Sequence, residues 1–374
     1  MLCLLKPIHW NPSGYAAPAG YRASSGYPKD HGFGHEEWNN ASRMRVTLDG
    51  LPFRALYTER VGKKGMTAPN DTLLLMYASH DGRQQLVGIA GSARYVDRED
   101  DAKLIRTIKK QVRTAELWSE AWKEPLVQKC FGTQKALRDH WETIGELNPN
   151  WVCPEESFFW LEEPLDLDPA KITGKSKLLT MFSSFTDIPA ERAAYLLDSI
   201  PAELRNSAWR TIRESLDVAA VAEDVKNVAR DKRLDETTQK ALIDARRGQG
   251  HFRDELLRLY GRRCALTGCG IEEVLRASHI RPWHSSNNSE RLDPNNGVLL
   301  AAHADALFDR YLVSFDDKGR LLLSDGLDEE GLGVLGLSGK MRIALRPAQR
   351  AYMADHRQEF EERNRLRAVT TKEG

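Results

Sequence analysis

The sequence predicts an α+β fold in which two globular parts flank a helical connector. Short apolar runs separated by turn residues fill residues 1–185, a charged stretch of helical period fills 186–247, and a strand, loop, strand, helix order marks 248–374. At 374 residues the chain is long enough for two domains. We therefore expect an N-terminal mixed sheet or barrel with helices, a connector and a C-terminal domain over those three ranges.

Composition excludes some classes of function. Lys and Arg number 54 and so do Asp and Glu, which gives a net charge of +0. A protein that coats nucleic acid regardless of sequence is usually basic, whereas an enzyme needs only a local basic cleft. The five cysteines are odd in number and scattered, so we expect no disulfide framework. The apolar start Met1–Leu5 is too short for a signal peptide, and we expect a cytoplasmic protein without a membrane segment.

Strand-like runs alternate with turn residues in the first part. The expected strands are Met44–Leu48, Phe53–Thr58, Leu73–Tyr77, Leu86–Ala90, Phe158–Leu161 and Leu178–Phe182. The expected turns are Asp49-Gly50, Gly62–Gly65 and Asp81-Gly82. Asp81-Gly82 between two apolar runs favours a tight hairpin.

Apolar residues at three- and four-residue steps predict the helices. In the first part they predict helices over Arg98–Lys123 and Thr133–Ile144. Farther along, Gly261 closes an expected helix over His251–Tyr260, and a polar helix over Pro347–Arg365 ends the fold.

Three polar residues mark a candidate hydrolytic centre in the last part. His279 ends one apolar run, Asn296 precedes a second, and His303 lies at the start of the helix that follows. Hydrolysis of a phosphodiester needs a base of nearly neutral pKa, and a divalent cation stabilises the charge on the leaving oxygen. An Asn before a strand can hold the intervening loop in shape through backbone contacts.

The spacing of these residues resembles that of the HNH nucleases. The resemblance rests on several spaced elements: Phe252-Arg253, Cys264-Ala265-Leu266-Thr267-Gly268, Ser278-His279-Ile280-Arg281-Pro282-Trp283, Arg291-Leu292-Asp293, Asn296-Gly297 and His303-x-Asp305-x-Leu307-Phe308-Asp309. It covers about residues 248–316 and is closest to the branch found on bacterial restriction-type endonucleases. It implies a ββα-metal fold with His279 as general base, Asn296 as positioning residue and His303 as metal ligand.

Ser278 departs from the family pattern, because many HNH enzymes carry Asp or His there as a second metal ligand. Asp305, Asp309, water or the substrate phosphate could replace it, and we favour Asp305 with Ser278 beside it. Asp305 and Asp309 are four residues apart and would share a helix face. The expected cofactor is Mg²⁺, with Mn²⁺ or Ni²⁺ as alternatives. Cys264 and Cys269 have no second Cys pair, so no structural zinc is expected.

Arginines crowd the nuclease-like segment. Arg276 and Arg281 flank His279 most closely, and we expect them to contact DNA phosphates.

The first part is similar, over shorter stretches, to the PUA-like superfamily with its EVE and YTH modules. The similarity rests on residues 32–39, 74–80 and 86–90. It implies an aromatic pocket for a modified base, for which Trp10, Trp38 and Ser79 are candidates.

Together the two resemblances imply a modification-dependent restriction endonuclease, acting on DNA with modified bases in phage defence and working as a homodimer. One alternative is an effector HNH nuclease switched on by a small molecule or a partner protein. The other is a nucleic-acid-binding regulator whose nuclease domain is inactive, which Ser278 keeps open.

Overall fold

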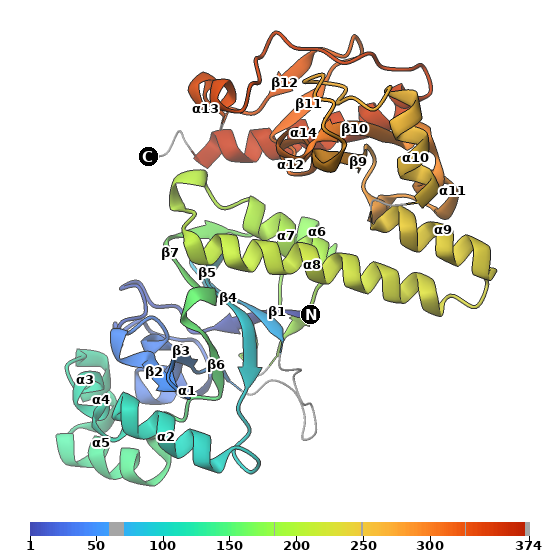
Figure 1. Ribbon diagram of the computed structural model, residues 1–374. Coiled ribbons are helices and arrows are strands. Elements are labelled where there is room, and N and C mark those ends of the chain that lie inside the picture. Colours follow the sequence, from blue (N-terminus) through green and yellow to red (C-terminus); the bar gives the residue numbers. More distant parts are fainter. Residues whose placement is uncertain (60–70, 183, 248–249, 326, 371–374) are drawn as a thin grey trace. The chain divides into compact units, whose positions relative to one another are not determined.

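The computed structural model describes residues 1–59, 71–182, 184–247, 250–325 and 327–370 (Figure 1). The chain divides into two compact units, Met1–Asp217 and Val218–Gly374. Their boundary falls inside the helix α8 (Ser207–Arg230), so residues 186–217 belong to the first unit and 218–247 to the second. None of the described helices is long and apolar enough to cross a membrane.

A mixed sheet forms the centre of the first unit. Its strands are β1 (Leu2–Ile8), β2 (Arg45–Leu48), β3 (Leu51–Leu56), β4 (Thr72–His80), β5 (Arg83–Tyr95), β6 (Trp151–Pro154), β7 (Phe158–Asp166) and β8 (Thr186–Asp187). The order is β2-β3-β6-β5-β4-β1-β8, with β7 paired to β5. β1 runs parallel to β4, and the other pairs are antiparallel. The long β5 joins both halves of the sheet, since it pairs with β4 and β7 first and with β6 at its end.

Helices cover one part of this sheet. They are α1 (Gly26–His31), α2 (Ala102–Val112), α3 (Trp118–Ala121), α4 (Pro125–Phe131), α5 (Gln134–His140), α6 (Pro169–Thr173) and α7 (Ala190–Asp198). Helices α2 to α5 gather near β2, β3 and β6 (Figure 1). Their apolar faces share one core with residues of those strands, among them Val46, Ala55 and Val152.

The tight turn at Asp81-Gly82 is confirmed. Both residues have positive φ, 47° and 78°, and they join the paired residues His80 and Arg83 of β4 and β5. Two central residues with positive φ match the right-handed twist of the flanking strands. The expected turn at Gly62–Gly65 lies outside the described residues.

Several features of the first unit differ from the sequence prediction. Strands β1, β6 and β8 were not predicted. The expected strand Leu178–Phe182 is wrong, because the Gln84 side chain instead accepts from the Leu178 N–H at 2.8 Å and donates to its carbonyl at 3.3 Å. The expected helix over Arg98–Lys123 is interrupted, since Arg113 adopts φ 61° and ends α2.

The second unit is built around a two-stranded hairpin. Its elements, after α8, are α9 (Glu236–Arg246), α10 (Gly250–Leu259), β9 (Leu275–His279), α11 (Asn288–Leu292), β10 (Gly297–Ala301), α12 (Ala302–Asp309), β11 (Val313–Phe315), β12 (Leu321–Leu323), α13 (Glu329–Val334) and α14 (Gln349–Thr370). β9 and β10 pair antiparallel, with His279 opposite Gly297 and Ser278 opposite Val298. The predicted order of strand, loop, strand and helix is therefore present.

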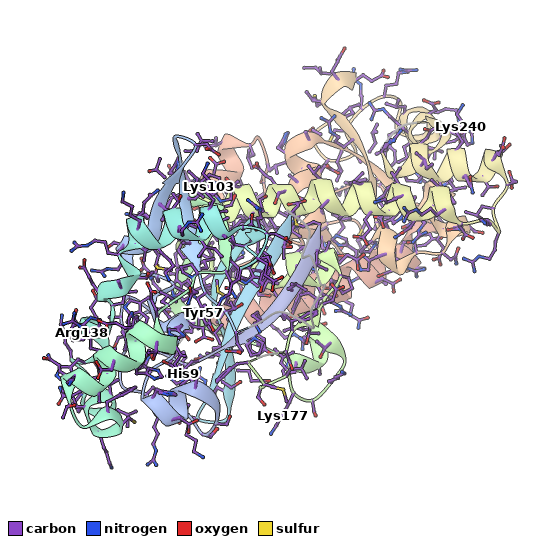
Figure 2. All side chains as sticks on the ribbon, turned by 90° about the horizontal axis from the view of Figure 1, so that it is seen from below. His9, Tyr57, Lys103, Arg138, Lys177 and Lys240 are labelled. Atoms are coloured by element: carbon purple, nitrogen blue, oxygen red, sulfur yellow. The ribbon has the colours of Figure 1, made fainter. Side chains whose placement is uncertain are left out.

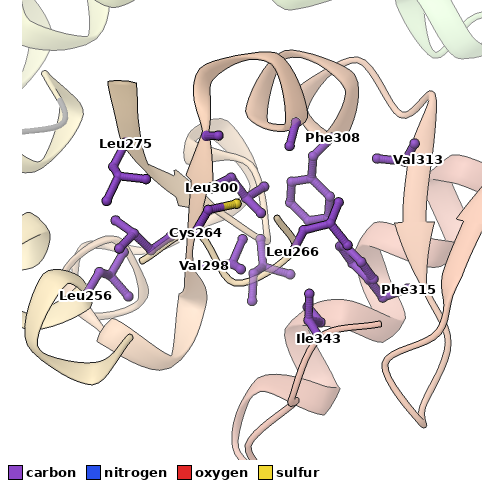
Figure 3. Packing of buried hydrophobic residues seen from close by; sticks show 14 of the residues in the cluster. Leu256, Cys264, Leu266, Leu275, Val298, Leu300, Phe308, Val313, Phe315 and Ile343 are labelled. Carbon is purple, nitrogen blue, oxygen red and sulfur yellow. The ribbon is translucent and has the colours of Figure 1, made fainter. Parts of the chain in front are cut away.

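The hairpin is sandwiched by helices. Side chains alternate along a strand, so His279 and Gly297 share one face while Ser278 lies on the other. Helix α10 packs on the His279 face, and α12 packs on the Ser278 face. The buried residues of this unit form one cluster, which includes Leu256, Leu300, Phe308 and Phe315 (Figure 3).

Gly297 is required by this packing. A Cβ at this position would lie 2.7 Å from Leu256 Cδ1 and 2.8 Å from Phe252 Cζ. Only a residue without a side chain lets α10 approach the hairpin so closely.

Candidate active site

His279 ends β9, and aromatic rings fix its imidazole. The ring stacks on Phe252 of α10 at a centroid distance of 4.3 Å and an angle of 5°. Trp283 meets it edge-on at 5.7 Å and 83°. The side chain is half-buried, so the site combines a fixed ring with partial access to solvent.

A backbone contact sets the tautomer of His279. Its Nε2 lies 2.9 Å from the carbonyl oxygen of Arg291. A carbonyl can only accept, so Nε2 carries the proton in this contact and Nδ1 is the basic nitrogen. The loop between β9 and β10 thereby prepares one nitrogen of His279 to take a proton.

The surroundings of His279 keep its imidazole neutral. Burial lowers its pKa to about 4; the Arg291 carbonyl opposes this shift, and the charges of Arg246 and Arg291 add to it. Near neutral pH the ring is thus an unprotonated acceptor, as a general base must be.

Asn296 is fully buried and holds the same loop together. Its Oδ1 accepts from the Arg281 N–H at 2.7 Å, and its Nδ2 donates to the Glu290 carbonyl at 3.0 Å and to Ser286 Oγ at 3.3 Å. Its own carbonyl accepts from the Ile280 N–H at 3.0 Å. The structure thus places Asn296 where it fixes the loop that carries the Arg291 carbonyl.

His303 lies in the first turn of α12. Its Nε2 is buried without a hydrogen-bond partner in the described structure. A buried, unpartnered imidazole nitrogen suits a ligand from outside the protein, and HNH nucleases generally use a divalent metal. No group of three His, Cys, Asp or Glu side chains that could hold a metal occurs within the described parts of the chain.

Ser278 contacts carboxylates of α12. Its hydroxyl donates to Asp309 Oδ1 at 3.2 Å and also hydrogen-bonds Asp305. Burial raises the pKa of Asp305, while the Ser278 hydroxyl and the charges of Arg276 and Arg310 oppose that rise. The shared helix face expected for Asp305 and Asp309 is confirmed, and Ser278 lies opposite it.

The two arginines expected to bind DNA have different surroundings. Arg281 forms ion pairs with Glu290 and Asp355 and lies over the Tyr352 ring at 4.9 Å. Its charge is therefore compensated within the unit. Arg276 is exposed, and its guanidinium donates to the backbone carbonyls of Glu273 and Leu275, both at 3.1 Å.

Trp10, Trp38 and Ser79, the three candidates for a base pocket in the first unit, have different surroundings in the structure. Trp38 is fully buried and donates to Glu120 Oε2 at 2.8 Å, so it belongs to the core and has no ring face for a ligand. Trp10 is partly exposed and stacks on His80 at 3.7 Å. Ser79 is exposed and precedes His80 in β4, so its side chain leaves the opposite face of the strand, where its Oγ accepts from Gln84 Nε2 at 3.1 Å. The structure therefore does not bring Ser79 and Trp10 together on one face.

Sequence reasoning missed two contacts of His279. The ring of Phe252 comes from a helix far from the motif, and the acceptor at Arg291 is a backbone carbonyl, which no residue type reveals. The helical pattern over His251–Tyr260 and the Phe252-Arg253 pair of the resemblance pointed to this helix, but neither predicted the stacking of Phe252 on His279.

A comparison with protein families supports the chemistry of this site. Residues 264–316 match the family model described as HNH endonuclease. The match includes β9, β10, α12 and β11, and thus His279, Asn296 and His303. No curated protein matches the chain. The second unit therefore carries an HNH endonuclease domain, and its activity is hydrolysis of phosphodiesters.

Proposed function

We propose that this protein is a modification-dependent DNA endonuclease of the restriction type, with His279 as its general base. The observation that carries the proposal is the contact of His279 Nε2 with the Arg291 carbonyl, inside the segment that matches the HNH endonuclease model. This contact leaves Nδ1 as the proton acceptor at the end of β9.

In this proposal water loses a proton to His279 Nδ1, and its oxygen attacks the phosphorus. The bond from phosphorus to the 3′ oxygen breaks, which leaves a 5′ phosphate, and the leaving oxygen takes up a proton. A bound phosphodiester brings negative charge to the imidazole and favours its protonated form, so the substrate opposes the lowering of the pKa by burial. Asn296 keeps the loop and its Arg291 carbonyl in place.

His303 and Asp305 are the residues we propose to hold the divalent cation, with Mg²⁺ as the expected ion. The unpartnered Nε2 of His303 supports the first assignment, and the buried carboxyl of Asp305 supports the second. Mg²⁺ keeps several waters and needs only one or two protein ligands beside substrate phosphate. When bound, such a cation stabilises the charge that develops on the phosphodiester oxygens. Ser278 would act through Asp305.

The first unit is the proposed selector of modified DNA in phage defence. Support comes from Trp10, a partly exposed ring that stacks on His80 and so offers an aromatic face, while the Ser79 side chain leaves the other face of β4. One HNH centre cuts one strand, so a double-strand break would require two copies of the chain, as in a homodimer.

The test is digestion of plasmid and phage DNAs that carry different cytosine and adenine modifications, in buffer with Mg²⁺. We expect the wild type to cut a modified subset and His279→Ala to bind the same DNAs without cutting them. His251→Ala, an exposed histidine of α10, is the control and should cut like the wild type.

Two results would contradict the proposal. Equal cutting of modified and unmodified DNA would exclude the selector role of the first unit. Undiminished cutting by His279→Ala would exclude His279 as the base.

A further inference from the structure

Two arginines lie over the tryptophan that contacts His279. The guanidinium carbons of Arg291 and Arg246 are 4.6 Å and 5.6 Å from the centroid of the Trp283 ring. Trp283 in turn meets the His279 ring at 5.7 Å. Arg246 belongs to α9, so a helix outside the matched residues 264–316 reaches the nuclease centre.

Arg246 and Arg291 differ in position and in ion pairing from Arg276 and Arg281, the two arginines that flank His279 in sequence. Arg281 is bound by two carboxylates, as described above. Arg276 is three residues before His279 in the same strand, so its side chain leaves the opposite face of β9. Arg246 and Arg291 instead lie near the His279 ring, and both act electrostatically on it.

We propose that Arg246 and Arg291 bind the phosphate backbone of the substrate at the nuclease centre. Trp283 positions both guanidiniums through cation–π contacts with its ring. The proposal rests on the nuclease function of this unit and names where the DNA backbone lies. Hydrolysis of a phosphodiester requires cations beside the reacting phosphate, because negative charge grows there in the transition state. Planar guanidiniums match two phosphate oxygens at once.

Contacts orient both side chains. Arg246 Nε donates to Asp224 Oδ2 at 2.7 Å, which forms an ion pair. Arg291 Nε donates to the Trp283 carbonyl at 3.0 Å, and its Nη1 donates to Asn288 Oδ1 at 3.1 Å. A guanidinium has five N–H donors, so contacts through one or two of them fix its plane over the Trp283 ring.

The test is the salt dependence of DNA binding by the full chain. The protein carries His279→Ala to prevent cleavage, and the probe is a fluorescein-labelled DNA duplex in Mg²⁺ buffer. We expect Arg246→Gln and Arg291→Gln each to reduce the slope of log Kd against log salt by about one, because each removes one phosphate contact. Arg246→Lys and Arg291→Lys should keep most of the slope, since the charge remains.

Arg363→Gln is the matched control. Arg363 lies over Tyr311 at 4.3 Å in the same unit, and that ring packs against His356. This variant loses a cation–π contact elsewhere and should keep the wild-type slope.

A second pair of variants tests the proposal in the opposite direction. Asp224→Asn removes the carboxylate that faces Arg246, and we expect tighter binding with a steeper salt slope. Asp317→Asn removes an exposed carboxylate that pairs with Arg357, and it changes the net charge equally. If Arg246→Gln or Arg291→Gln does not fold, the comparison of Asp224→Asn with Asp317→Asn still tests the proposal.

The proposed phosphate binding by Arg246 and Arg291 would be wrong if folded Arg246→Gln and Arg291→Gln kept the wild-type salt slope. It would also be wrong if Asp224→Asn and Asp317→Asn changed DNA binding equally. The nuclease assignment would survive either result, because it depends on cleavage by the protein with intact His279. If the protein with intact His279 cut no DNA, the proposed function would be wrong. The salt slopes of DNA binding would still show whether Arg246 and Arg291 contact phosphates.

Discussion

At the residue scale, Asn296 connects the chemistry of the site to its stability. Its amide satisfies the Arg281 N–H and the Glu290 carbonyl deep in the loop. We expect Asn296→Ala to lower the free energy of unfolding by about 1–3 kcal/mol, because buried polar groups lose their partners. Urea unfolding measures this loss, and cleavage should fall with it as the Arg291 carbonyl moves away from His279.

The neighbouring Asn295 is the control for this prediction. It is partly exposed and bonds within its own turn to Asp293. Asn295→Ala should therefore cost less than Asn296→Ala, and equal losses would contradict the role assigned to Asn296.

The sequence was enough to predict which elements carry the three polar residues of the candidate site. His279, Asn296 and His303 each adjoin an apolar run, and the structure places them at the strand ends and helix start that those runs imply. It could not predict that Trp38 belongs to the core, since a ring for a pocket and a ring for a core look alike in sequence. Arg246 was one of the many arginines noticed in the sequence, but it could not be singled out, because its contact with Trp283 joins segments far apart in the chain.

At the scale of elements, the contact of α10 with the hairpin depends on Gly297. We expect Gly297→Ala to destabilise the protein by about 1–3 kcal/mol, because its Cβ would overlap Leu256 and Phe252. Phe252 also stacks on His279, so cleavage should decrease as well. Thermal unfolding and a cleavage assay on the same preparation measure both effects.

Gly333→Ala serves as the comparison for this substitution. Beyond its chain neighbours and the backbone of its own helix α13, no atom of the described residues lies within 4 Å of a Cβ at Gly333, and alanine favours helix. This variant should be as stable as the wild type or more stable. A destabilisation equal to that of Gly297→Ala would show that the α10 contact is not the cause.

Local patterns predicted elements better than they predicted pairing. Short-range signals were enough for the Asp81-Gly82 hairpin and for α10. Local patterns could not predict the parallel pairing of β1 with β4, because this pairing joins residues about seventy positions apart. The segment after α6 looked like a strand by composition, but a glutamine side chain satisfies its backbone instead.

At the scale of the whole molecule, the two units bury different kinds of titratable groups. The second unit buries His356, whose pKa burial lowers to about 3. The first unit buries His9 and His35, with pKa values lowered by burial to about 4, but also Glu36 and Glu37, with pKa values raised by burial to about 7 and about 8. His9 and Tyr57, labelled in Figure 2, lie in this first unit.

These groups act on stability in opposite directions. A histidine with a lowered pKa stabilises fully above its unfolded value of 6.5, and that stability is lost as the pH falls from 6.5 toward about 4. A glutamate with a raised pKa stabilises fully below its unfolded value of 4.5, and that stability is lost as the pH rises through about 7 to 8. Between pH 6.5 and 8 these histidines no longer change, and the two glutamates remove stability as the pH rises. The buried Lys6, whose pKa burial lowers to about 8, opposes this loss only toward the upper end of the range.

Glu37→Gln isolates the alkaline loss. Glutamine has nearly the shape of the protonated acid and no charge to bury, but its NH2 cannot accept, whereas the Glu37 carboxyl accepts from Asn11 at 2.9 Å and from the Gly34 N–H at 2.8 Å. This lost hydrogen bond costs the variant the same at every pH. We therefore expect the Tm of the variant relative to that of the wild type to rise steadily between pH 4.5 and 8, as measured by calorimetry. The exposed Glu116→Gln should show no such trend. A Tm difference independent of pH would mean that Glu37 is not protonated in the folded protein, because only a proton held in the buried carboxyl makes the wild type lose stability in alkali while the amide does not.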